Sequence, residues 1–155
     1  MKILSINVSE PQKVTFNGKE LITSIYKKPV SNKVTVSSQG IEGYRQADLT
    51  VHGGYDKAVY AYSYTHYQTW SEKLNSAFKD YGLVGENLTI DDFDEDKINI
   101  GDQFKINECL LQVSQPRIPC YKIGIKLNSR EFPKMFSQSG LLGSYLRVIH
   151  DGEIS

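Results

Sequence analysis

The sequence contains few of the residues that mark metal sites and disulfide frameworks. It has 2 cysteines and 3 histidines in 155 residues. None of the histidines is paired with another histidine or with a cysteine at the spacing of zinc ligands. No Walker-type or Rossmann glycine pattern occurs either, which excludes nucleotide binding through those two loops.

The chain also lacks net charge and long apolar runs. The 18 Lys and Arg residues balance 18 Asp and Glu residues. No overall field therefore attracts a nucleic acid polymer or an anionic membrane, and any anion site must be local. No stretch approaches the ~20 apolar residues of a membrane span. The N-terminal residues alternate like a strand, unlike a signal peptide, so we expect reduced thiols and a cytoplasmic location.

Short segments typical of β-strands fill most of the sequence. They alternate apolar and polar residues or are rich in β-branched and aromatic side chains, and Asn17-Gly18 is a strong hairpin-turn pattern. A mainly β fold follows for residues 1–155, which we expect to form a single domain built as a closed or nearly closed β-barrel. The expected strands are residues 2–8, 18–26, 33–37, 58–62, 104–113 (one or two strands) and 145–149.

One segment has helical rather than strand periodicity. It predicts one main helix over about residues 64–80, with Ser63 as its N-terminal cap and Gly82 as its stop. A short second helix is expected after Pro133. The aromatic stripe on the main helix is most simply its core face. The residues that set the helical period are Tyr67, Trp70, Leu74 and Phe78.

The segment Ser-Gln-Pro-Arg-Ile-Pro-Cys at residues 114–120 carries most of the functional information. Two prolines restrict the backbone, so the sulfur of Cys120 has a defined direction. A nearby cation such as Arg117 favours the thiolate, which is the nucleophile and metal ligand. A reactive cysteine is therefore the functional interpretation, and a packing cysteine in a plain loop is the alternative. Cys109 alternates with apolar neighbours, so we expect it in the core, without a disulfide.

A polar block at residues 43–57 gathers charged side chains around Gly53-Gly54, directly before a strand. Adjacent glycines permit positive φ angles and let a ligand approach the backbone. The block is interpreted as a binding loop, with an ordinary polar turn as the alternative. Residues 85–89 form a weaker candidate of the same kind. The charged members of the block are Arg45, Asp48, His52, Asp56 and Lys57.

The acidic run at residues 92–97 begins like a calcium-binding loop. Lys97 stands where such a loop requires glycine, and Gln103 stands where it requires its closing glutamate. The run is therefore expected to be a solvated loop.

In matching order, four blocks between about Val30 and Arg147 resemble the MOSC domain family, named for the C-terminal domain of molybdenum cofactor sulfurase. The resemblance is to its bacterial hydroxylaminopurine-resistance, or YiiM-like, branch. In that branch a small helical region commonly follows the segment matching residues 145–148, whereas this sequence stops at Ser155. The domain is thus expected without that extension. The four blocks are residues 48–62, 85–89, 100–102 and 114–122.

The resemblance implies a β-barrel with a molybdenum cofactor, Mo-molybdopterin, rather than pyridoxal phosphate, and with the metal held by Cys120. It also implies reduction of N-hydroxylated bases or related compounds, from N–OH to N–H with loss of water, using electrons from a partner reductase. A soft thiolate suits such a metal, and the pterin phosphate needs local cations. The catalytic candidates are Cys120, His52 and Asp56. The cofactor-binding candidates are Arg117, Lys57, Arg45, Gln115, Ser114 and Asn87.

Two alternative functions remain open at the level of the sequence. The first alternative is a carrier that holds molybdopterin, or sulfur as a persulfide on Cys120, without turning over substrate, since a thiolate beside an arginine serves both purposes. A third class is a cysteine nucleophile that uses His52 as its base.

Overall fold

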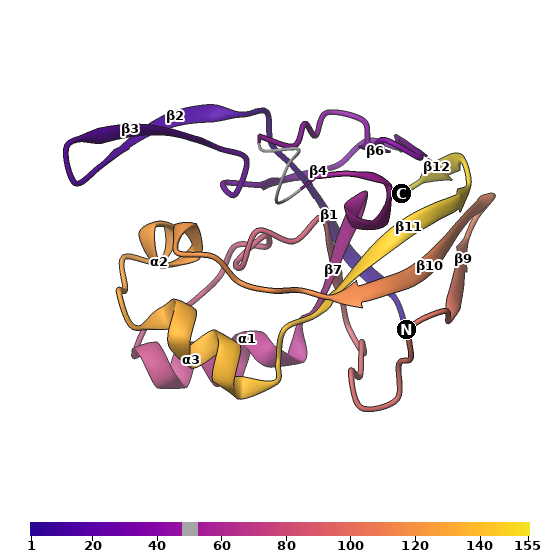
Figure 1. Cartoon of the computed structure of the whole chain (residues 1–155). Helices are drawn as coiled ribbons and strands as arrows, with labels where there is room; N and C mark the ends of the chain where they lie inside the picture. The colour runs from indigo at the N-terminus through magenta and orange to yellow at the C-terminus, as the bar shows by residue number, and fades with distance from the viewer. Residues whose placement is uncertain (48–52) are drawn as a thin grey trace.

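Most of the regular secondary structure is β-strand, and the helices are few and short (Figure 1). The computed structural model describes residues 1–47 and 53–155. In chain order the elements are β1 (Ile3–Val8), β2 (Gln12–Phe16), β3 (Lys19–Thr23), β4 (Lys28–Val30), β5 (Val34–Ser37), β6 (Gly40–Ile41), the 3-10 helix η1 (Tyr55–Lys57), β7 (Val59–Ser63), α1 (Thr65–Leu74), β8 (Leu88–Ile90), β9 (Gln103–Ile106), β10 (Cys109–Pro116), α2 (Lys122–Lys126), α3 (Phe132–Ser139), β11 (Ser144–His150) and β12 (Gly152–Ile154).

A curled seven-stranded sheet forms the centre of the molecule, in the order β4-β1-β8-β7-β11-β10-β9. Its neighbouring strands are antiparallel, except β7 and β8, which are parallel. A smaller sheet has the order β12-β5-β6, and β2 and β3 form a separate hairpin that projects from the body in Figure 1. The strand-rich fold confirms the prediction of a mainly β protein.

The predicted closed or nearly closed barrel is wrong, because the large sheet stops at two open edges. In the described part of the chain, β4 pairs only with β1 and β9 pairs only with β10. The sheet is therefore a curled half-barrel. Apolar residues of the three-stranded sheet pack with those of the large sheet in one core, so they are buried between two sheets instead of inside one closed ring.

The first hydrophobic core lies between these two sheets. Burial of apolar surface here stabilises the fold by removing the inner face of each strand from water. Cys109 is fully buried in this core, as its alternation predicts, and both cysteines are free thiols. Other members are Ile6, Val59, Leu88, Leu111 and Val148 from the large sheet and Val36, Ile41 and Ile154 from the small one.

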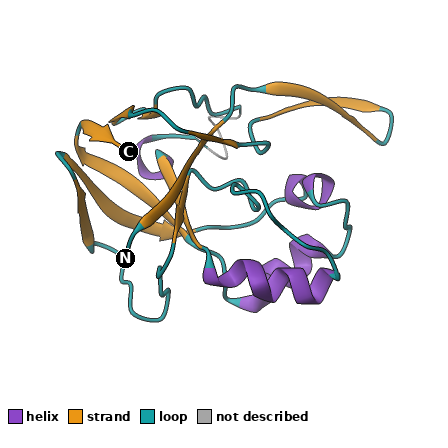
Figure 2. Cartoon of the chain, turned by 180° about the vertical axis from the view of Figure 1, so that it is seen from behind, coloured by secondary structure: helices purple, strands orange, loops and turns teal. Residues whose placement is uncertain are grey.

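The second core is aromatic and joins β7 and β11 to the three helices, which gather on one side of the strands (Figure 2). Trp70 is its largest fully buried side chain, and its indole N–H donates to the hydroxyl of Tyr62 at 2.6 Å. Phe132 and Phe136 of α3 stack with ring centroids 5.5 Å apart. This core fixes the helices against the sheet. None of the helices in the described residues is long and apolar enough to cross a membrane.

The main helix is shorter than predicted, since α1 ends at Leu74 instead of near residue 80. Asn75 adopts φ 47, ψ 47, and this left-handed residue ends the helix with its N–H bonded to the carbonyl of Glu72. Gly82 is therefore not the stop. Ser63 is not the cap either, because its hydroxyl contacts the Thr65 hydroxyl at 2.9 Å. The short helix expected after Pro133 is confirmed as α3, whereas α2 had no prediction.

Gly143 places β11 against β7 and gives a direct test of this packing. Its φ is +70, and a Cβ there would lie 2.4 Å from the carbonyl oxygen of Ala61. Gly140 has a similar φ of +74 but nothing within 4 Å of its Cβ position. We expect Gly140→Ala to lower the free energy of unfolding by about 1–2 kcal/mol through backbone strain alone. Gly143→Ala should cost about 1–3 kcal/mol more through overpacking.

Denaturant unfolding of both variants measures this difference. Equal losses of stability in the two variants would contradict the close approach of β11 to β7.

Candidate functional site

Cys120 lies at a pocket between the loop that follows β10 and the segment that follows β3. The side chain of Cys120 is half-buried. The space between the lining residues amounts to about 510 Å³, including the part open to solvent. Three cations, Lys27, Arg117 and Lys122, line this pocket together with three tyrosines, Tyr44, Tyr60 and Tyr145. A thiol, cationic groups and aromatic rings thus share one cavity.

The chain places Cys120 by ending a strand and starting a helix within a few residues. Pairing of β10 with β11 runs to Pro116 opposite Ser144, and the Arg117 N–H then bonds to the Gly143 carbonyl at 3.2 Å. The Cys120 carbonyl accepts a hydrogen bond from Ile123 at 3.3 Å as α2 begins. The backbone around Cys120 is therefore anchored on both sides, which confirms the predicted loop at the end of a strand.

Among the cations of the pocket, Arg117 is the most buried, and it is one that the sequence predicted. Its side chain is 6% exposed, and its guanidinium lies 4.4 Å from the centroid of the Tyr60 ring. One terminal nitrogen donates to the Val84 carbonyl at 3.0 Å. Its Nε has no hydrogen-bond partner among residues 1–47 and 53–155. A buried donor of this kind is favourable only when a ligand or water accepts from it.

Two further cations join Arg117 at the backbone of residues 82–85. Each of the three donates to a different carbonyl of this loop, so the loop is surrounded by positive charge. The three donor–acceptor pairs are Lys27 Nζ to Gly85 O at 2.7 Å, Arg117 to Val84 O at 3.0 Å and Lys126 Nζ to Gly82 O.

The fully buried carboxylate of Glu86 compensates part of this charge. An ionised carboxylate only accepts hydrogen bonds, and each hydrogen bond of Glu86 within residues 1–47 and 53–155 comes from a donor. The donors are the backbone N–H groups of Gly82 at 3.1 Å and Val84 at 3.0 Å, the hydroxyl of Thr89 at 2.9 Å and the hydroxyl of Tyr67.

Burial and mutual repulsion favour the neutral forms of the two lysines. Desolvation, followed by Arg117 and Lys126, holds the pKa of Lys27 well below its usual range, while Glu86 opposes the shift. Desolvation also lowers the pKa of Lys126 to about 8, with Glu86 acting against it and Arg117 adding to it. Arg117 remains charged under all ordinary conditions.

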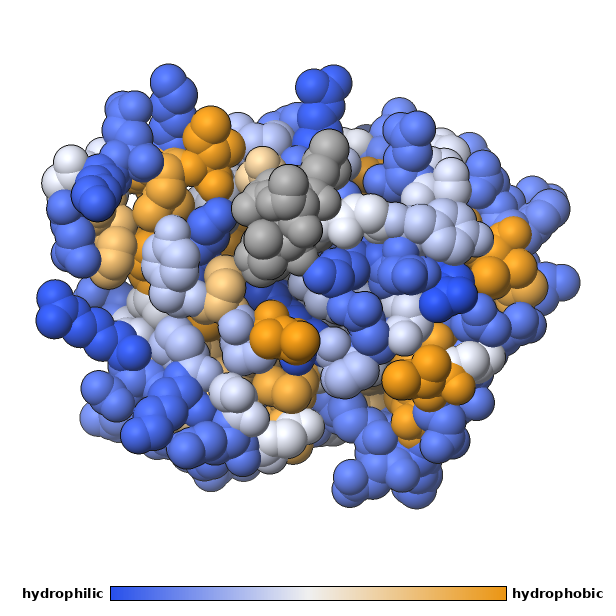
Figure 3. Space-filling model, in the orientation of Figure 1, coloured by the Kyte–Doolittle hydropathy of each residue, from blue (hydrophilic) through white to orange (hydrophobic). Residues whose placement is uncertain are grey.

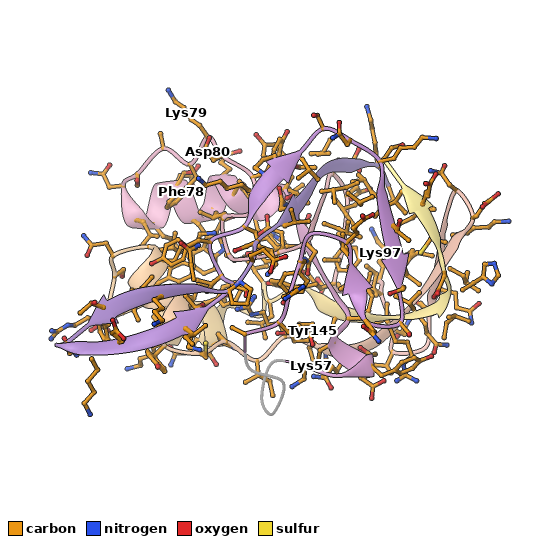
Figure 4. All side chains as sticks on the ribbon, turned by 90° about the horizontal axis from the view of Figure 1, so that it is seen from above. Lys57, Phe78, Lys79, Asp80, Lys97 and Tyr145 are labelled. Carbon is orange, nitrogen blue, oxygen red and sulfur yellow. The ribbon has the colours of Figure 1, made fainter. Side chains whose placement is uncertain are left out.

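The polar block at residues 43–57 divides between the pocket and its surroundings. The ammonium of Lys57 lies 5.9 Å from the centroid of the Tyr145 ring, and Tyr145 lines the pocket (Figure 4). Asp56 does not line the pocket, and its carboxylate is paired with Arg147 at 3.0 Å. Arg45 is exposed and pairs with Glu10 at 3.6 Å. Asp48 and His52 lie outside the described residues.

Ser114, Gln115 and Asn87 belong to the framework that supports the pocket. The Ser114 hydroxyl donates to the carbonyls of Asp56 and Tyr145, and Gln115 is paired with Tyr145 between β10 and β11. The Asn87 side chain accepts from the N–H of Tyr60 at 3.1 Å and donates to the backbone carbonyl of Asn7 in β1 at 3.3 Å. These three residues position the tyrosines, and none of them lines the pocket.

Sequence reasoning missed Lys27, Lys126 and Tyr44 and did not single out Glu86 within the 85–89 block. The two lysines resemble ordinary surface lysines in sequence, because nothing local shows that Lys27 is buried and Lys126 half-buried. The Gly-Glu pair before a strand was the available sign of a built loop, although Glu and Gly together are also common in turns.

The surface near Cys120 has an apolar component beside its charges. Ile118 is 76% exposed and Tyr121 is 57% exposed, so two large side chains flank the cysteine in solvent. The face shown in Figure 3 is largely hydrophilic, with separate hydrophobic patches, one of them over the β2–β3 hairpin. The sulfur therefore lies close to a surface that another molecule can approach.

Comparison with known families matches the model of the MOSC domain to residues 48–155. The chain belongs to the MOSC domain family, as the motifs predicted. Its relatives include the Bacillus subtilis protein YflK, with 40% identity over 99% of this chain and 69% of YflK. Escherichia coli YiiM is 33% identical over 86% of this chain and 60% of YiiM.

A third relative is a Gibberella moniliformis protein named "Reductase". It is 32% identical over 88% of this chain, and the match covers 25% of the fungal protein. The family, the YiiM relatives and this reductase together indicate a function related to the molybdenum cofactor.

Solved structures of relatives share the fold. The crystal structure of YiiM from Geobacillus stearothermophilus matches with a TM-score of 0.81 and 36% identity, over 99% of this chain and 70% of that one. YiiM from Escherichia coli matches with a TM-score of 0.73 and 30% identity, over 84% of this chain and 61% of that one. The chain thus spans about two thirds of the length of these relatives.

The lowered pKa of Lys126 predicts how stability depends on pH. The folded chain releases this proton near pH 8, whereas the unfolded chain releases it at about 10.4. Between these values the unfolded state binds more protons at Lys126, so its contribution to the free energy of unfolding rises with pH. We expect wild type to gain about 1 kcal/mol or more over Lys126→Met between about pH 7.5 and 9.5.

Urea unfolding across this pH range tests the prediction. Lys134→Met, which removes an exposed lysine of α3, controls for the loss of a positive charge. A constant difference between wild type and Lys126→Met would contradict the lowered pKa.

Proposed function

We propose that this chain binds the molybdenum cofactor and reduces N-hydroxylated bases or related compounds, converting N–OH to N–H. The observation that carries the proposal is the common pocket of the Cys120 thiol and the buried cations Lys27 and Arg117. Family membership supports the cofactor, and the relative named "Reductase" supports redox chemistry.

The chemistry of the lining residues fits this cofactor. A thiolate is a soft ligand and suits molybdenum, which the sulfur of the cofactor already binds. Cys120 is therefore the proposed metal ligand. The unpartnered Nε of Arg117 and the amines of Lys27 and Lys122 suit the phosphate, whose negative charge favours the protonated form of Lys27. The aromatic rings of the pocket provide flat apolar surfaces for a pterin.

The proposed overall reaction consumes two electrons and two protons and breaks one N–O bond. It converts R–NH–OH to R–NH₂ and water. When bound, the cofactor supplies the redox chemistry, and the protein supplies binding, orientation and electrostatics. Among this chain's groups, Lys27 and Arg117 neutralise negative charge in the pocket. The tyrosine walls reduce its contact with water.

Proton delivery to the departing hydroxyl is proposed for His52, as the sequence predicts. Histidine titrates near neutral pH and is suited to that task. Asp56 is a weaker candidate for direct contact with substrate, because it pairs with Arg147 and does not line the pocket. It holds η1 against β11 instead. The electrons are proposed to come from a separate reductase protein in the cytoplasm.

A second candidate function is a carrier that transfers the cofactor, or sulfur from a persulfide on Cys120, to another protein. The exposed side chains of Ile118 and Tyr121 beside Cys120 favour it, because they leave the sulfur accessible to a partner. The enzyme hypothesis predicts many turnovers of an N-hydroxylated purine per molecule of protein with an artificial electron donor. The carrier hypothesis predicts at most one equivalent of transferred sulfur or cofactor. Counting product per protein distinguishes them.

Replacing the metal ligand tests the proposed site. Protein purified from a host that makes the cofactor should contain molybdenum, and Cys120→Ala should lower the molybdenum content by roughly tenfold or more, since it removes the only thiol in the pocket described here. Cys109→Ala is the matched control, because it removes a thiol that is buried in the core.

Inductively coupled plasma mass spectrometry on fresh protein gives both values. Full retention of molybdenum in Cys120→Ala would overturn the assignment of the metal ligand.

Loss of the buried guanidinium tests the proposed phosphate contact separately. Arg117→Met should lower the pterin content of the purified protein by about tenfold, because bidentate or charge-assisted hydrogen bonds to phosphate are lost. Arg130→Met, which removes an exposed arginine outside the pocket, should leave the pterin content unchanged. Fluorescence of the oxidised pterin released from each protein is the measurement, and equal losses in the two variants would count against the pocket.

A further inference from the structure

The backbone of residues 82–85 is held in one conformation by close packing as well as by hydrogen bonds. Gly82 and Gly85 have φ angles of +80 and +83, and the Gly85 N–H closes the turn onto the Gly82 carbonyl at 3.0 Å. A Cβ at Gly82 would lie 2.8 Å from the Lys27 carbonyl oxygen. A Cβ at Gly85 would lie 2.8 Å from a side-chain carbon of Ile25. The loop therefore packs directly on the segment that carries Lys27.

The two kinds of backbone group in this loop have different partners. The N–H groups of Gly82 and Val84 point to the carboxylate of Glu86. The carbonyls of residues 82, 84 and 85 point to Lys126, Arg117 and Lys27. The peptide unit between Gly82 and Leu83 links the two sets, because its N–H donates to the Tyr67 hydroxyl that is bonded to Glu86, while its C=O, on the opposite side, accepts from Lys126.

Helix α1 holds the carboxylate in turn. The Tyr67 hydroxyl donates to Glu86 and accepts from the Leu83 N–H at 3.2 Å. The Thr89 hydroxyl donates to the same carboxylate oxygen at 2.9 Å and accepts from the Asn7 side chain at 3.0 Å. Glu86 is thus fixed by groups from α1, β1 and β8, and it does not line the pocket.

We propose that Glu86 is a positioning residue for anion binding: through the loop at residues 82–85 it holds Lys27 and Arg117 where they face the pocket. This inference rests on the proposed function, since it concerns the cations assigned to the cofactor's phosphate. Counting charges alone would predict tighter anion binding when a nearby negative charge is removed. Removing this negative charge near an anion site should weaken anion binding, because the cations lose both their anchored acceptors and their counter-charge.

Inorganic phosphate is the probe, with protein made in a host that cannot synthesise the cofactor, so that the outcome is independent of metal binding and turnover. Glu86→Gln keeps the size of the side chain and removes its charge. We expect it to weaken phosphate binding by about tenfold at neutral pH, as loss of a supporting contact commonly does. Glu131→Gln, which removes an exposed carboxylate next to α3, should change phosphate affinity by less than about twofold.

Two readouts distinguish positioning from a general loss of structure. NMR titration of the lysine amines should show the pKa of Lys126 falling below about 8 in Glu86→Gln, because Glu86 raises it in wild type. Tyr67→Phe removes one donor to Glu86 and keeps its charge. It should weaken phosphate binding less than Glu86→Gln does, and it decides the matter if Glu86→Gln does not fold.

Phosphate affinity in a folded Glu86→Gln variant that equals or exceeds that of wild type would overturn the proposal. In that case Tyr67→Phe should likewise have no effect on phosphate binding. Neither result bears on whether Cys120 binds molybdenum, which the metal content of Cys120→Ala tests separately.

Discussion

The pocket depends on one buried carboxylate and the loop that it holds. Glu86 accepts hydrogen bonds from the backbone of residues 82 and 84 and from Tyr67 and Thr89, so the loop presents its carbonyls to three cations. A carboxylate buried in a low-dielectric interior is favourable only when it is paired and hydrogen-bonded in this way. The arrangement places positive charge beside the Cys120 thiol, in a protein whose formal net charge is zero.

The molecule has no net charge, but it holds a local cluster of positive charge. The equal numbers of acidic and basic residues give no net field, yet Lys27, Arg117 and Lys126 meet within one small volume. Their repulsion and desolvation are costs that the fold carries in the absence of a ligand. A bound anion offsets both costs, which is why the cluster is better explained as a binding site than as a stabilising feature. Cys120 lies half-buried in the same pocket as Lys27 and Arg117.

Local pattern predicted the strands and the cysteine loop, because both depend on neighbours in sequence. Alternation identified β1, β-branched and aromatic side chains identified β5 and β7, and the prolines around Cys120 identified its loop. Closure of the sheet was not predictable, since it depends on whether the distant strands β4 and β9 meet. The burial of Lys27 was not predictable either. It follows from the packing of Gly82 on the backbone of Lys27 and of Gly85 on Ile25, contacts between segments far apart in the chain.

The central claim is that the sulfur of Cys120 binds molybdenum. Molybdenum K-edge X-ray absorption, recorded on wild type and on Cys120→Ser from a cofactor-producing host, tests it most directly. The account predicts that the number of sulfur neighbours of the metal falls by one in the variant, or that the metal is lost. Identical spectra from the two proteins, at equal molybdenum content, would contradict it.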